Sequence, residues 1–275
     1  MTHSSSNAPP AQGSALPVAV ITGAANGIGW ATAQVMAQAS WRVAVLDLQA
    51  DTAQDRASEL GAKHAGYACD VANSDSVNHA VQAVVQRFGR VDALVNNAGV
   101  ADQTAPTLEQ TVAGFDRVLA VHVRGTFLMS QAVLAQMLRQ NRDPRGNRGA
   151  VVNVGSIASF GGIPGRNAYC AAKAGVLGLT RAMAVEWARE GIRVNAVAPG
   201  YVNTALVAGL AEKGAIDAAG IAHRTPLGRM AEPTEMAEVI AFLASPKASY
   251  VTGATWSADG GWSAFGATER ALPEL

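Results

Sequence analysis

Short apolar, β-branched runs alternate along the chain with longer stretches in which apolar residues recur at helical spacing. The short runs predict strands at 18–22, 42–47, 64–70, 93–96, 150–154, 193–198 and 255–257. The longer stretches predict helices at 28–39, 50–60, 74–88, 111–139, 168–190 and 233–244. Several strands are apolar throughout, as strands covered on both faces should be. The alternation is typical of βαβ units and predicts an α/β fold around a parallel sheet.

The length and composition favour one globular domain. A chain of 275 residues lies in the size range of single α/β domains, and residues 16–275 are predicted to form one. Hydrophobic residues make up 49% of the chain and charged residues 15%, which is enough apolar material for a large core. Residues 1–15 lack the basic and apolar segments of a signal peptide and predict a flexible polar arm. The cytoplasm is the expected location.

The charge balance and the cysteines exclude several classes of partner. Lys and Arg number 21 together, and so do Asp and Glu, so no global field would attract nucleic acid or an anionic membrane. No window approaches the ~18 uninterrupted apolar residues of a membrane span. Cys69 and Cys170 have no CxxC or Cys/His spacing, so no disulfide and no metal site are predicted. Cys170 is interpreted as a small buried residue rather than a nucleophile.

Two segments interrupt the alternation of strands and helices. Residues 139–148 hold four arginines around Pro144 and Gly146. These turn signals favour a solvated turn over an anion or nucleic-acid patch. Residues 200–232 form a long connection, rich in Ala and Gly, directly after a strand. Long ordered connections of this kind are usually lids or binding loops, so a substrate loop is predicted there.

Three glycines follow the first predicted strand and open the first predicted helix. Gly23 permits a tight turn, Gly27 lets the backbone approach a pyrophosphate, and Gly29 allows close contact between helix and strand. The helix N-terminus that follows offers free N–H groups and a positive dipole end to an anion. Glycine triplets also occur in ordinary turns, so their position after the first strand is what favours a dinucleotide site.

Asp47 closes the second predicted strand, eighteen positions after Gly29. A carboxylate at this place can accept hydrogen bonds from the hydroxyls of the adenosine ribose and would repel the 2′-phosphate of NADP. Neither Ala25 nor Asn26 supplies a positive charge, and Arg42 lies at the other end of its strand. NAD is therefore the predicted cofactor. The alternative is that Asp47 only caps the helix that begins near residue 50.

Tyr169 and Lys173 lie four positions apart on a predicted helix and so share one face. A tyrosine hydroxyl ordinarily titrates near ~10, and a close ammonium favours the phenolate, which would make Tyr169 an acid/base group. Ser156 precedes Tyr169 by thirteen residues and follows the strand at 150–154 directly. The alternative is a core tyrosine followed by a surface lysine.

From about residue 16 to the C-terminus, the chain resembles the short-chain dehydrogenase/reductase family. The Thr22–Gly29 glycine pattern, Asn96-Asn97-Ala98-Gly99, Ser156, Tyr169-x-x-x-Lys173 and Pro199-Gly200 carry the resemblance, in the family's order and spacing. It implies a Rossmann-like doubly wound parallel sheet of about seven strands with helices on both faces. It also implies a small-molecule alcohol or ketone as substrate and a homo-oligomer, by resemblance a tetramer.

The resemblance assigns roles to individual residues. Ser156 is expected to hold the substrate oxygen while Tyr169 exchanges its proton, so both contact the substrate. Lys173 is expected to hold the nicotinamide ribose. The full set of expected cofactor contacts is Gly23, Asn26, Gly27, Ile28, Gly29, Asp47, Asp70, Val71, Asn97, Ala98, Gly99, Tyr169, Lys173, Pro199, Val202 and Thr204.

His122 departs from the family pattern, which often has an asparagine there as a fourth catalytic residue. Asparagine and neutral imidazole can both donate and accept a hydrogen bond, so our hypothesis is that His122 serves as a neutral relay in the proton path. The alternative for a histidine among valines is a satisfied core residue.

The leading hypothesis is an NAD-dependent dehydrogenase of a small secondary alcohol, polyol or sugar. The alternatives are an NADH-dependent carbonyl reductase and, from another class, a non-catalytic dinucleotide-binding sensor or scaffold. The intact Ser156, Tyr169 and Lys173 disfavour the sensor. Substrate contacts are expected from 157–166, 201–224 and 262–265, which contain Phe160, Arg166, Tyr201, His223 and Trp262.

Overall fold

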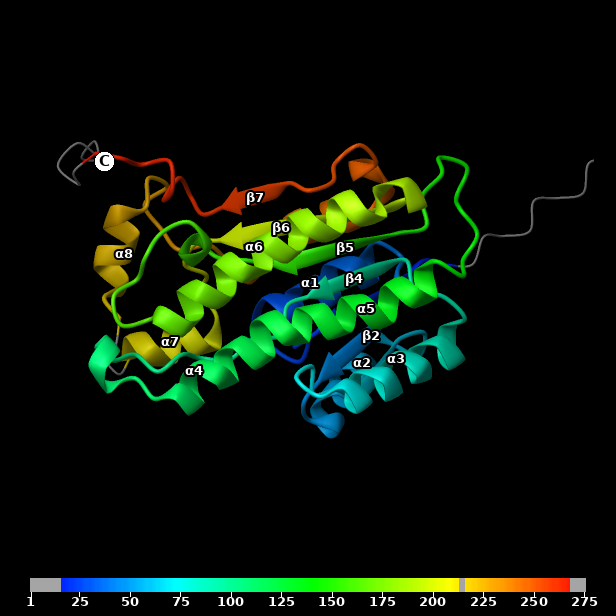
Figure 1. The fold of residues 1–275 in the computed structure, drawn as a ribbon, viewed down its shortest axis with the longest axis horizontal. Helices are drawn as coiled ribbons and strands as arrows, with labels where there is room; N and C mark the ends of the chain where they lie inside the picture. Colours follow the sequence, from blue (N-terminus) through cyan, green and yellow to red (C-terminus); the bar gives the residue numbers. More distant parts are fainter. Residues whose placement is uncertain (1–15, 213–215, 268–275) are drawn as a thin grey trace, which may run out of the picture.

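The computed structural model describes residues 16–212 and 216–267, and the predicted arm at 1–15 lies outside them (Figure 1). Seven parallel strands form one sheet in the order β3-β2-β1-β4-β5-β6-β7. Their bounds are β1 Val18–Thr22, β2 Arg42–Asp47, β3 Ala65–Ala68, β4 Ala93–Asn96, β5 Gly149–Val154, β6 Ile192–Pro199 and β7 Thr255–Ala258. The strand order reverses between β1 and β4, which is where open parallel sheets bind ligands.

Helices cover both faces of the sheet. One layer holds α1 (Gly27–Gln38), α2 (Ala50–Leu60) and α9 (Pro233–Ala244). The other holds α3 (Ser74–Phe88), α5 (Gly125–Met137), which continues α4 (Val112–Leu119), and α6 (Asn167–Trp187). Short 3-10 turns occupy Thr107–Glu109, Ile157–Ser159, Ala188–Glu190 and Pro246–Ala248. The fold is therefore the doubly wound, Rossmann-like one that the sequence predicted.

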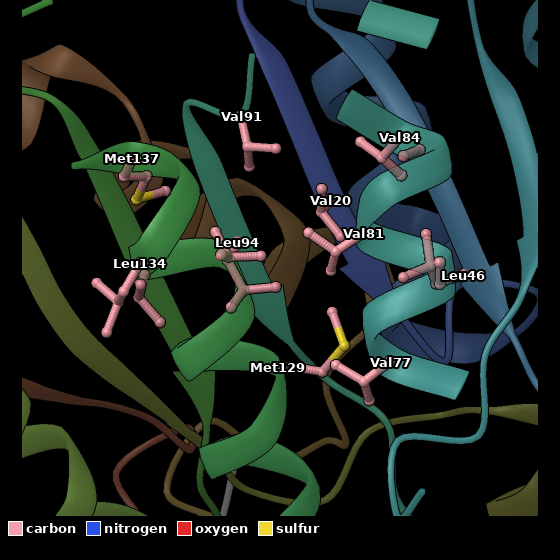
Figure 2. Close-up of a cluster of buried hydrophobic side chains, with 14 of the residues drawn as sticks. Val20, Leu46, Val77, Val81, Val84, Val91, Leu94, Met129, Leu134 and Met137 are labelled. Carbon is pink, nitrogen blue, oxygen red and sulfur yellow. The ribbon is translucent and has the colours of Figure 1, made fainter. Parts of the chain in front are cut away.

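Helices bury the sheet on both faces, and successive side chains of each strand point into opposite core layers. In β1, Val18 and Val20 face the α3–α5 layer, whereas Ala19 and Ile21 face the α1–α9 layer. Figure 2 shows Val20, Leu46 and Leu94 from three strands packed among side chains of α3 and α5, including Val81, Val84, Met129 and Met137. Burying a side chain of this size contributes about 1.5–3 kcal/mol relative to exposure. These layers hold the strand ends in fixed positions.

Three predicted elements differ from the structure. The third strand was predicted at 64–70 but ends at Ala68, because the Asp70 N–H turns out of the ladder to the Ser76 hydroxyl (2.9 Å). The helix predicted at 111–139 contains a π-helical turn at Ala120–Arg124, between α4 and α5. The connection at 200–232 contains α7 (Ala205–Glu212) and α8 (Ala218–Arg224). In Figure 1 the arrowheads of β6 and β7 point toward the end of the molecule where α7 and α8 lie.

The stretch Val112–Met137 is, within the described ranges, the one helix long and apolar enough by length and composition to cross a membrane. Its inner side chains Met129, Val133 and Met137 are fully buried against the sheet. Core packing accounts for the apolar character of this face.

The arginine-rich segment at 139–148 forms a turn between α5 and β5, as predicted. The Asp143 N–H donates to the Asn147 carbonyl (2.7 Å), which closes the turn. Arg142 and Arg148 both pair with Glu190, so half of the arginines in the segment are already partnered.

A buried polar network ties the middle of the sheet to α6. The Asn96 amide donates to Asn153 Oδ1 (2.8 Å), and the Asn153 amide donates to Thr180 Oγ1 on α6 (2.9 Å). Asn153 and Thr180 are completely buried. Because unpaired buried polar groups are costly, this network fixes how α6 lies along β5. The orientation of α6 in turn sets the places of Tyr169 and Lys173.

Candidate active site

The glycine turn after β1 brings strand and helix into close contact. Gly23 and Gly27 have positive φ angles of 60° and 56°, which glycine adopts readily. A Cβ on Gly29 would collide with the Gly23 carbonyl oxygen and lie 2.5 Å from the Asn97 amide nitrogen. The predicted reasons for Gly23 and Gly29, a tight turn and a close approach, both match this geometry.

The N-terminus of α1 is open to an anion. Asn26 is the N-cap residue, its backbone is extended, and its side chain makes no capping hydrogen bond to the first turn, which includes Ile28. A Cβ on Gly27 would lie 3.4 Å from the Thr204 methyl group, so the segment after β6 passes beside this turn. Unsatisfied N–H groups at a positive dipole end suit a pyrophosphate. The residues present therefore fit a dinucleotide cofactor.

Asn97 supports the glycine turn. Its side-chain amide donates to the carbonyl oxygens of Thr22 (2.9 Å) and Gly23 (3.0 Å). The backbone N–H of Ala98 donates to the Thr22 hydroxyl (3.0 Å). The Asn97 side chain thus holds β1 and β4 together at the strand ends, and the N–H groups of Asn97 and Ala98 are engaged in the same junction. The backbone carbonyl groups at 97–99 are the groups that could line a cofactor.

Asp47 lies beside the glycine turn. Its Oδ2 accepts from the Ala25 N–H (3.1 Å) and its Oδ1 from the Leu48 N–H (2.8 Å). The N-cap residue of α2 is Gln49, and the interpretation of Asp47 as the cap of that helix is wrong. The carboxylate is half-buried where the resemblance expects the adenosine ribose.

Arg56 is a cation near this position that the sequence analysis missed. Its Nε donates to the Ala25 carbonyl (3.0 Å), its guanidinium lies 4.8 Å from the Trp30 ring centroid, and it forms an ion pair with Glu59 (3.0 Å). Arg56 is on α2, nine positions beyond Asp47, so only the packing of α2 against α1 reveals it. Neither Ala25 nor Asn26 supplies a positive charge, but Arg56 places one beside Ala25 that the sequence analysis did not consider.

The other expected cofactor residues lie at the same edge of the sheet. Asp70 and Val71 follow β3, and the Asp70 carboxylate accepts from the Ala72 N–H (2.9 Å) while Val71 packs against Gly125. Pro199 ends β6, and Val202 forms a bridge to Ala231 that closes the base of the α7–α8 connection. Carboxyl ends of parallel strands meet at one edge, which explains why residues distant in sequence converge.

Ser156, Tyr169 and Lys173 meet beside this edge. The Ser156 side chain lies close enough to the Tyr169 hydroxyl to lower its pKa. The Lys173 ammonium donates to the Val154 carbonyl (2.7 Å) and lies 5.6 Å from the Tyr169 ring centroid. Ser156 and Lys173 are buried and Tyr169 is half-buried, so the lysine that follows Tyr169 is not the surface lysine that the alternative supposed.

Burial dominates the protonation of this group. It raises the pKa of Tyr169, against the opposing effects of the nearby Ser156 side chain and the Arg166 charge. Burial also lowers the pKa of Lys173 to about 8. The expected lowering of the Tyr169 pKa by Lys173 is not found here, because the ammonium is turned to the Val154 carbonyl. The neutral phenol is the favoured form.

Two further side chains position the tyrosine and were missed in the sequence. Asp102 Oδ2 accepts from the Tyr169 backbone N–H (2.9 Å), and the Ser159 hydroxyl donates to the Lys173 carbonyl (2.9 Å). Ser159 Oγ also accepts from the Ser156 N–H (3.2 Å), which links the Ser156 turn to α6. Both contacts cross long stretches of sequence, and no local motif marks them.

His122 lies in the π-helical turn and packs edge-on against Tyr169, with ring centroids 5.5 Å apart. Its Nε2 is 3.1 Å from the Val100 nitrogen and 3.0 Å from the Val100 oxygen. Its Nδ1 is buried and has no hydrogen-bond partner in the described part of the chain. A Cβ on Gly99 would lie 2.5 Å from the imidazole, so glycine is required there. π turns of this kind are frequent at functional sites.

The charge state of His122 follows from its surroundings. Burial, and then repulsion by Lys173, lower its pKa to about 3. The ring is therefore neutral near pH 7, as the relay hypothesis requires.

The residues expected to contact the substrate differ in their surroundings: some lie near Tyr169 or pack against one another, and others are exposed. Tyr201 packs against Trp262 (centroids 5.1 Å apart), and Arg166 lies 5.0 Å from the Tyr169 ring centroid. Phe160 and His223 are exposed. Cys170 is half-buried rather than buried, and its sulfur accepts from the Ile163 N–H (3.4 Å).

Known proteins resemble the chain over most of its length. A family model described as enoyl-(acyl carrier protein) reductase matches residues 23–263. The chain is 45% identical to cis-4-hydroxycyclohexanecarboxylate dehydrogenase of Sinomonas cyclohexanicum, over 90% of this chain and 96% of that one. It is 42% identical to D-threitol dehydrogenase of Mycolicibacterium smegmatis, over 90% and 92%.

Two further matches concern length and fold. An uncharacterised short-chain type dehydrogenase/reductase of Sinorhizobium fredii is 40% identical over 89% of this chain, which spans 43% of that longer protein. The crystal structure of a levodione reductase superposes with a TM-score of 0.82 at 36% identity, covering 90% of this chain and 98% of that one.

The depressed pKa of His122 predicts a pH-dependent stability. Its folded pKa of about 3 lies below the ordinary 6.5, so its contribution is complete above pH 6.5 and is lost as the pH falls toward 3. Wild type should therefore lose stability relative to His122→Asn over this window, by at most roughly 1.4 kcal/mol per pH unit. Urea unfolding at pH 7.5 and 4.5 measures the difference, with the exposed His79→Asn as control. Parallel losses in wild type and His122→Asn would contradict the prediction.

Proposed function

The chain belongs to the short-chain dehydrogenase/reductase family, and the relatives to which it is similar are oxidoreductases that act on CH–OH groups. From that premise we propose its specific reaction. It transfers a hydride between NAD and a small secondary alcohol, polyol or sugar, or the corresponding ketone. The observation that carries the proposal is the convergence of Ser156, Tyr169 and Lys173 at the same carboxyl edge of the sheet as the open N-terminus of α1. The dehydrogenases of a hydroxycyclohexane acid and of threitol, to which the chain is similar, support this substrate class.

In the proposed mechanism each side chain has a separate task. The Ser156 hydroxyl hydrogen-bonds the substrate oxygen, and Tyr169 exchanges a proton with that oxygen. In the oxidative direction Tyr169 removes the hydroxyl proton as the phenolate, which is the minor form in this site, and in the reductive direction it donates the proton as the phenol. NAD, when bound, supplies the hydride acceptor. Lys173, with a pKa of about 8, can pass protons near neutral pH.

The proposed cofactor site uses the α1 N-terminus for the pyrophosphate and Asp47 for the adenosine ribose. The preference for NAD rests on the Asp47 carboxylate, which lies beside Ala25. Arg56 opposes it, but its guanidinium already pairs with Glu59 and the Ala25 carbonyl. We therefore keep NAD as the proposed cofactor.

A carbonyl reductase is the second candidate, because one observation favours it. Burial keeps Tyr169 as the neutral phenol, which is the form that donates a proton to a ketone oxygen. The likeness to a levodione reductase supports this direction. The two candidates share one site and differ in the direction of a reversible reaction.

We also propose that His122 is a neutral relay and that the chain forms a homo-oligomer in the cytoplasm. The relay is supported by the contacts of Nε2 with Val100 and of the ring with Tyr169.

A homo-oligomer, by resemblance a tetramer, is supported by an apolar groove on the outer side of α4 and α5. This groove is lined by Leu119, Val123, Phe127 and Leu179 together with Asp116, Arg117 and Arg124.

Tyr169→Phe tests the chemistry. The variant keeps the ring packing but removes the hydroxyl, so we expect at least a ~10²-fold loss of turnover with NAD binding intact. NADH formation with a panel of secondary alcohols, together with NAD titration by fluorescence, measures both. The fully exposed Tyr250→Phe is the matched control. Turnover close to wild type in folded Tyr169→Phe would overturn the mechanism.

Asp47→Ala tests the cofactor choice. Wild type should have a higher kcat/KM with NAD than with NADP, and removing the carboxylate should narrow the ratio by about 10-fold, because charged hydrogen bonds to the ribose are lost. Asp51→Ala, on the first turn of α2, serves as control. A wild-type preference for NADP would show that Arg56 outweighs Asp47.

His122→Asn and His122→Leu test the relay. The asparagine variant should retain much of the activity, because an amide also donates and accepts hydrogen bonds. The leucine variant should lose most of it. Turnover is measured from pH 6 to 9 on purified variants with confirmed folding. A leucine variant as active as wild type across that range would make His122 a packing residue only.

A further inference from the structure

We propose that Arg166 selects substrates that carry a carboxylate near the reacting hydroxyl, with Arg224 as a second cation. The inference rests on the proposed function and names the substrate class more narrowly: a secondary alcohol on a hydrocarbon frame that ends in a carboxylate. It comes from charges around Tyr169 that the proposed mechanism does not use.

Arg166 lies directly before α6, and its guanidinium carbon is 5.0 Å from the centroid of the Tyr169 ring. Its Nε is buried and finds no hydrogen-bond acceptor within residues 16–212 and 216–267. In the same ranges Arg166 takes part in no ion pair with an Asp or Glu. A buried guanidinium donor without an acceptor is costly, and an incoming oxyanion would satisfy it.

The carboxylates beside the site are already engaged by the backbone. Asp102 accepts from the N–H groups of Tyr169 (2.9 Å) and Gln103 (2.8 Å). Asp259 accepts from the N–H groups of Gly261 and Ser263, both at 3.0 Å. Asp102 and Asp259 keep their negative charges, but within the described residues neither is a direct ion-pair partner for the guanidinium groups of Arg166 and Arg224.

Aromatic side chains connect the two arginines. Tyr201 is close enough to Tyr169 to act on its pKa, and it packs against Trp262 at 5.1 Å. Arg224 lies 4.3 Å from the Trp262 centroid, and its one hydrogen bond in the described chain is a long one to the Trp262 carbonyl (3.5 Å). The aromatic surface formed by Tyr201 and Trp262 suits the apolar ring or chain of a substrate. A guanidinium group lies at each end of this surface.

The geometry favours a carboxylate over a neutral polyol. A guanidinium presents parallel N–H groups that match the two oxygens of a carboxylate, and charge-assisted pairs of this kind are the stronger hydrogen bonds. Because Arg166 touches the Tyr169 ring, the anion and the reacting hydroxyl can be only a few bonds apart in one small molecule.

The test compares hydroxy acids with their methyl esters. The probes are 4-hydroxycyclohexanecarboxylate and 3-hydroxybutanoate, each against its ester, assayed for kcat and KM with NAD. Wild type should favour the acid of at least one pair. Arg166→Gln should reduce the acid-to-ester ratio of kcat/KM by about 10-fold or more, chiefly through KM, because a charged hydrogen bond is lost. Arg224→Gln should reduce it less, and exposed Arg139→Gln should leave it unchanged.

The ratio separates carboxylate recognition from any effect of Arg166 on Tyr169, since a change in the tyrosine alters acid and ester alike. Binding of cyclohexanecarboxylate and its methyl ester to the NAD-loaded protein, followed by Trp fluorescence, gives a readout without turnover. Esters used as well as acids, or a ratio unchanged in Arg166→Gln, would overturn the inference while leaving the dehydrogenase intact. Carboxylate binding that depends on Arg166, with no alcohol oxidised, would support the inference and overturn the proposed function.

Discussion

The burial of the parallel sheet on both faces is the constraint on which the rest of the structure depends. With helices on each side, the strand interiors must be apolar or fully hydrogen-bonded, so open polar chemistry collects at the carboxyl ends of the strands. Among the polar side chains buried inside the sheet, Asn96 bonds to Asn153, and Asn153 bonds to Thr180 on α6. This network anchors α6, and α6 in turn holds Tyr169 and Lys173 at the edge of the sheet.

The same burial sets the protonation of the candidate site. Tyr169, Lys173 and His122 are all shifted toward their neutral forms, with desolvation as the first cause in each case. Burial therefore affects the charge states of these three side chains more than their interactions with one another do. Lys173 stays close to Tyr169 through the Val154 carbonyl, and His122 reaches the ring because the π turn displaces it from regular helical register.

Charged side chains mark both ends of the proposed ligand path. At the adenosine end, Asp47 and Arg56 both contact Ala25, one through its N–H and the other through its carbonyl. At the substrate end, Arg166 and Arg224 form no ion pair with a carboxylate within the described chain. A neutral protein can thus present a strongly charged local site, because specific side chains rather than net charge determine the field that a small molecule meets.

The sequence by itself determined the strands, most helices, the glycine turn and the residues at the strand ends, because these depend on local periodicity and on spacing within one βαβ unit. Proximity in space was decided by the tertiary structure. Packing of α2 against α1 brought Arg56 to Ala25, and Asp102 reached the N-terminal turn of α6 across sixty-seven positions. The π turn at His122 and the two helices at 200–232 also escaped prediction. Such contacts lower the free energy only after distant segments have packed, so no local pattern of residues encodes them.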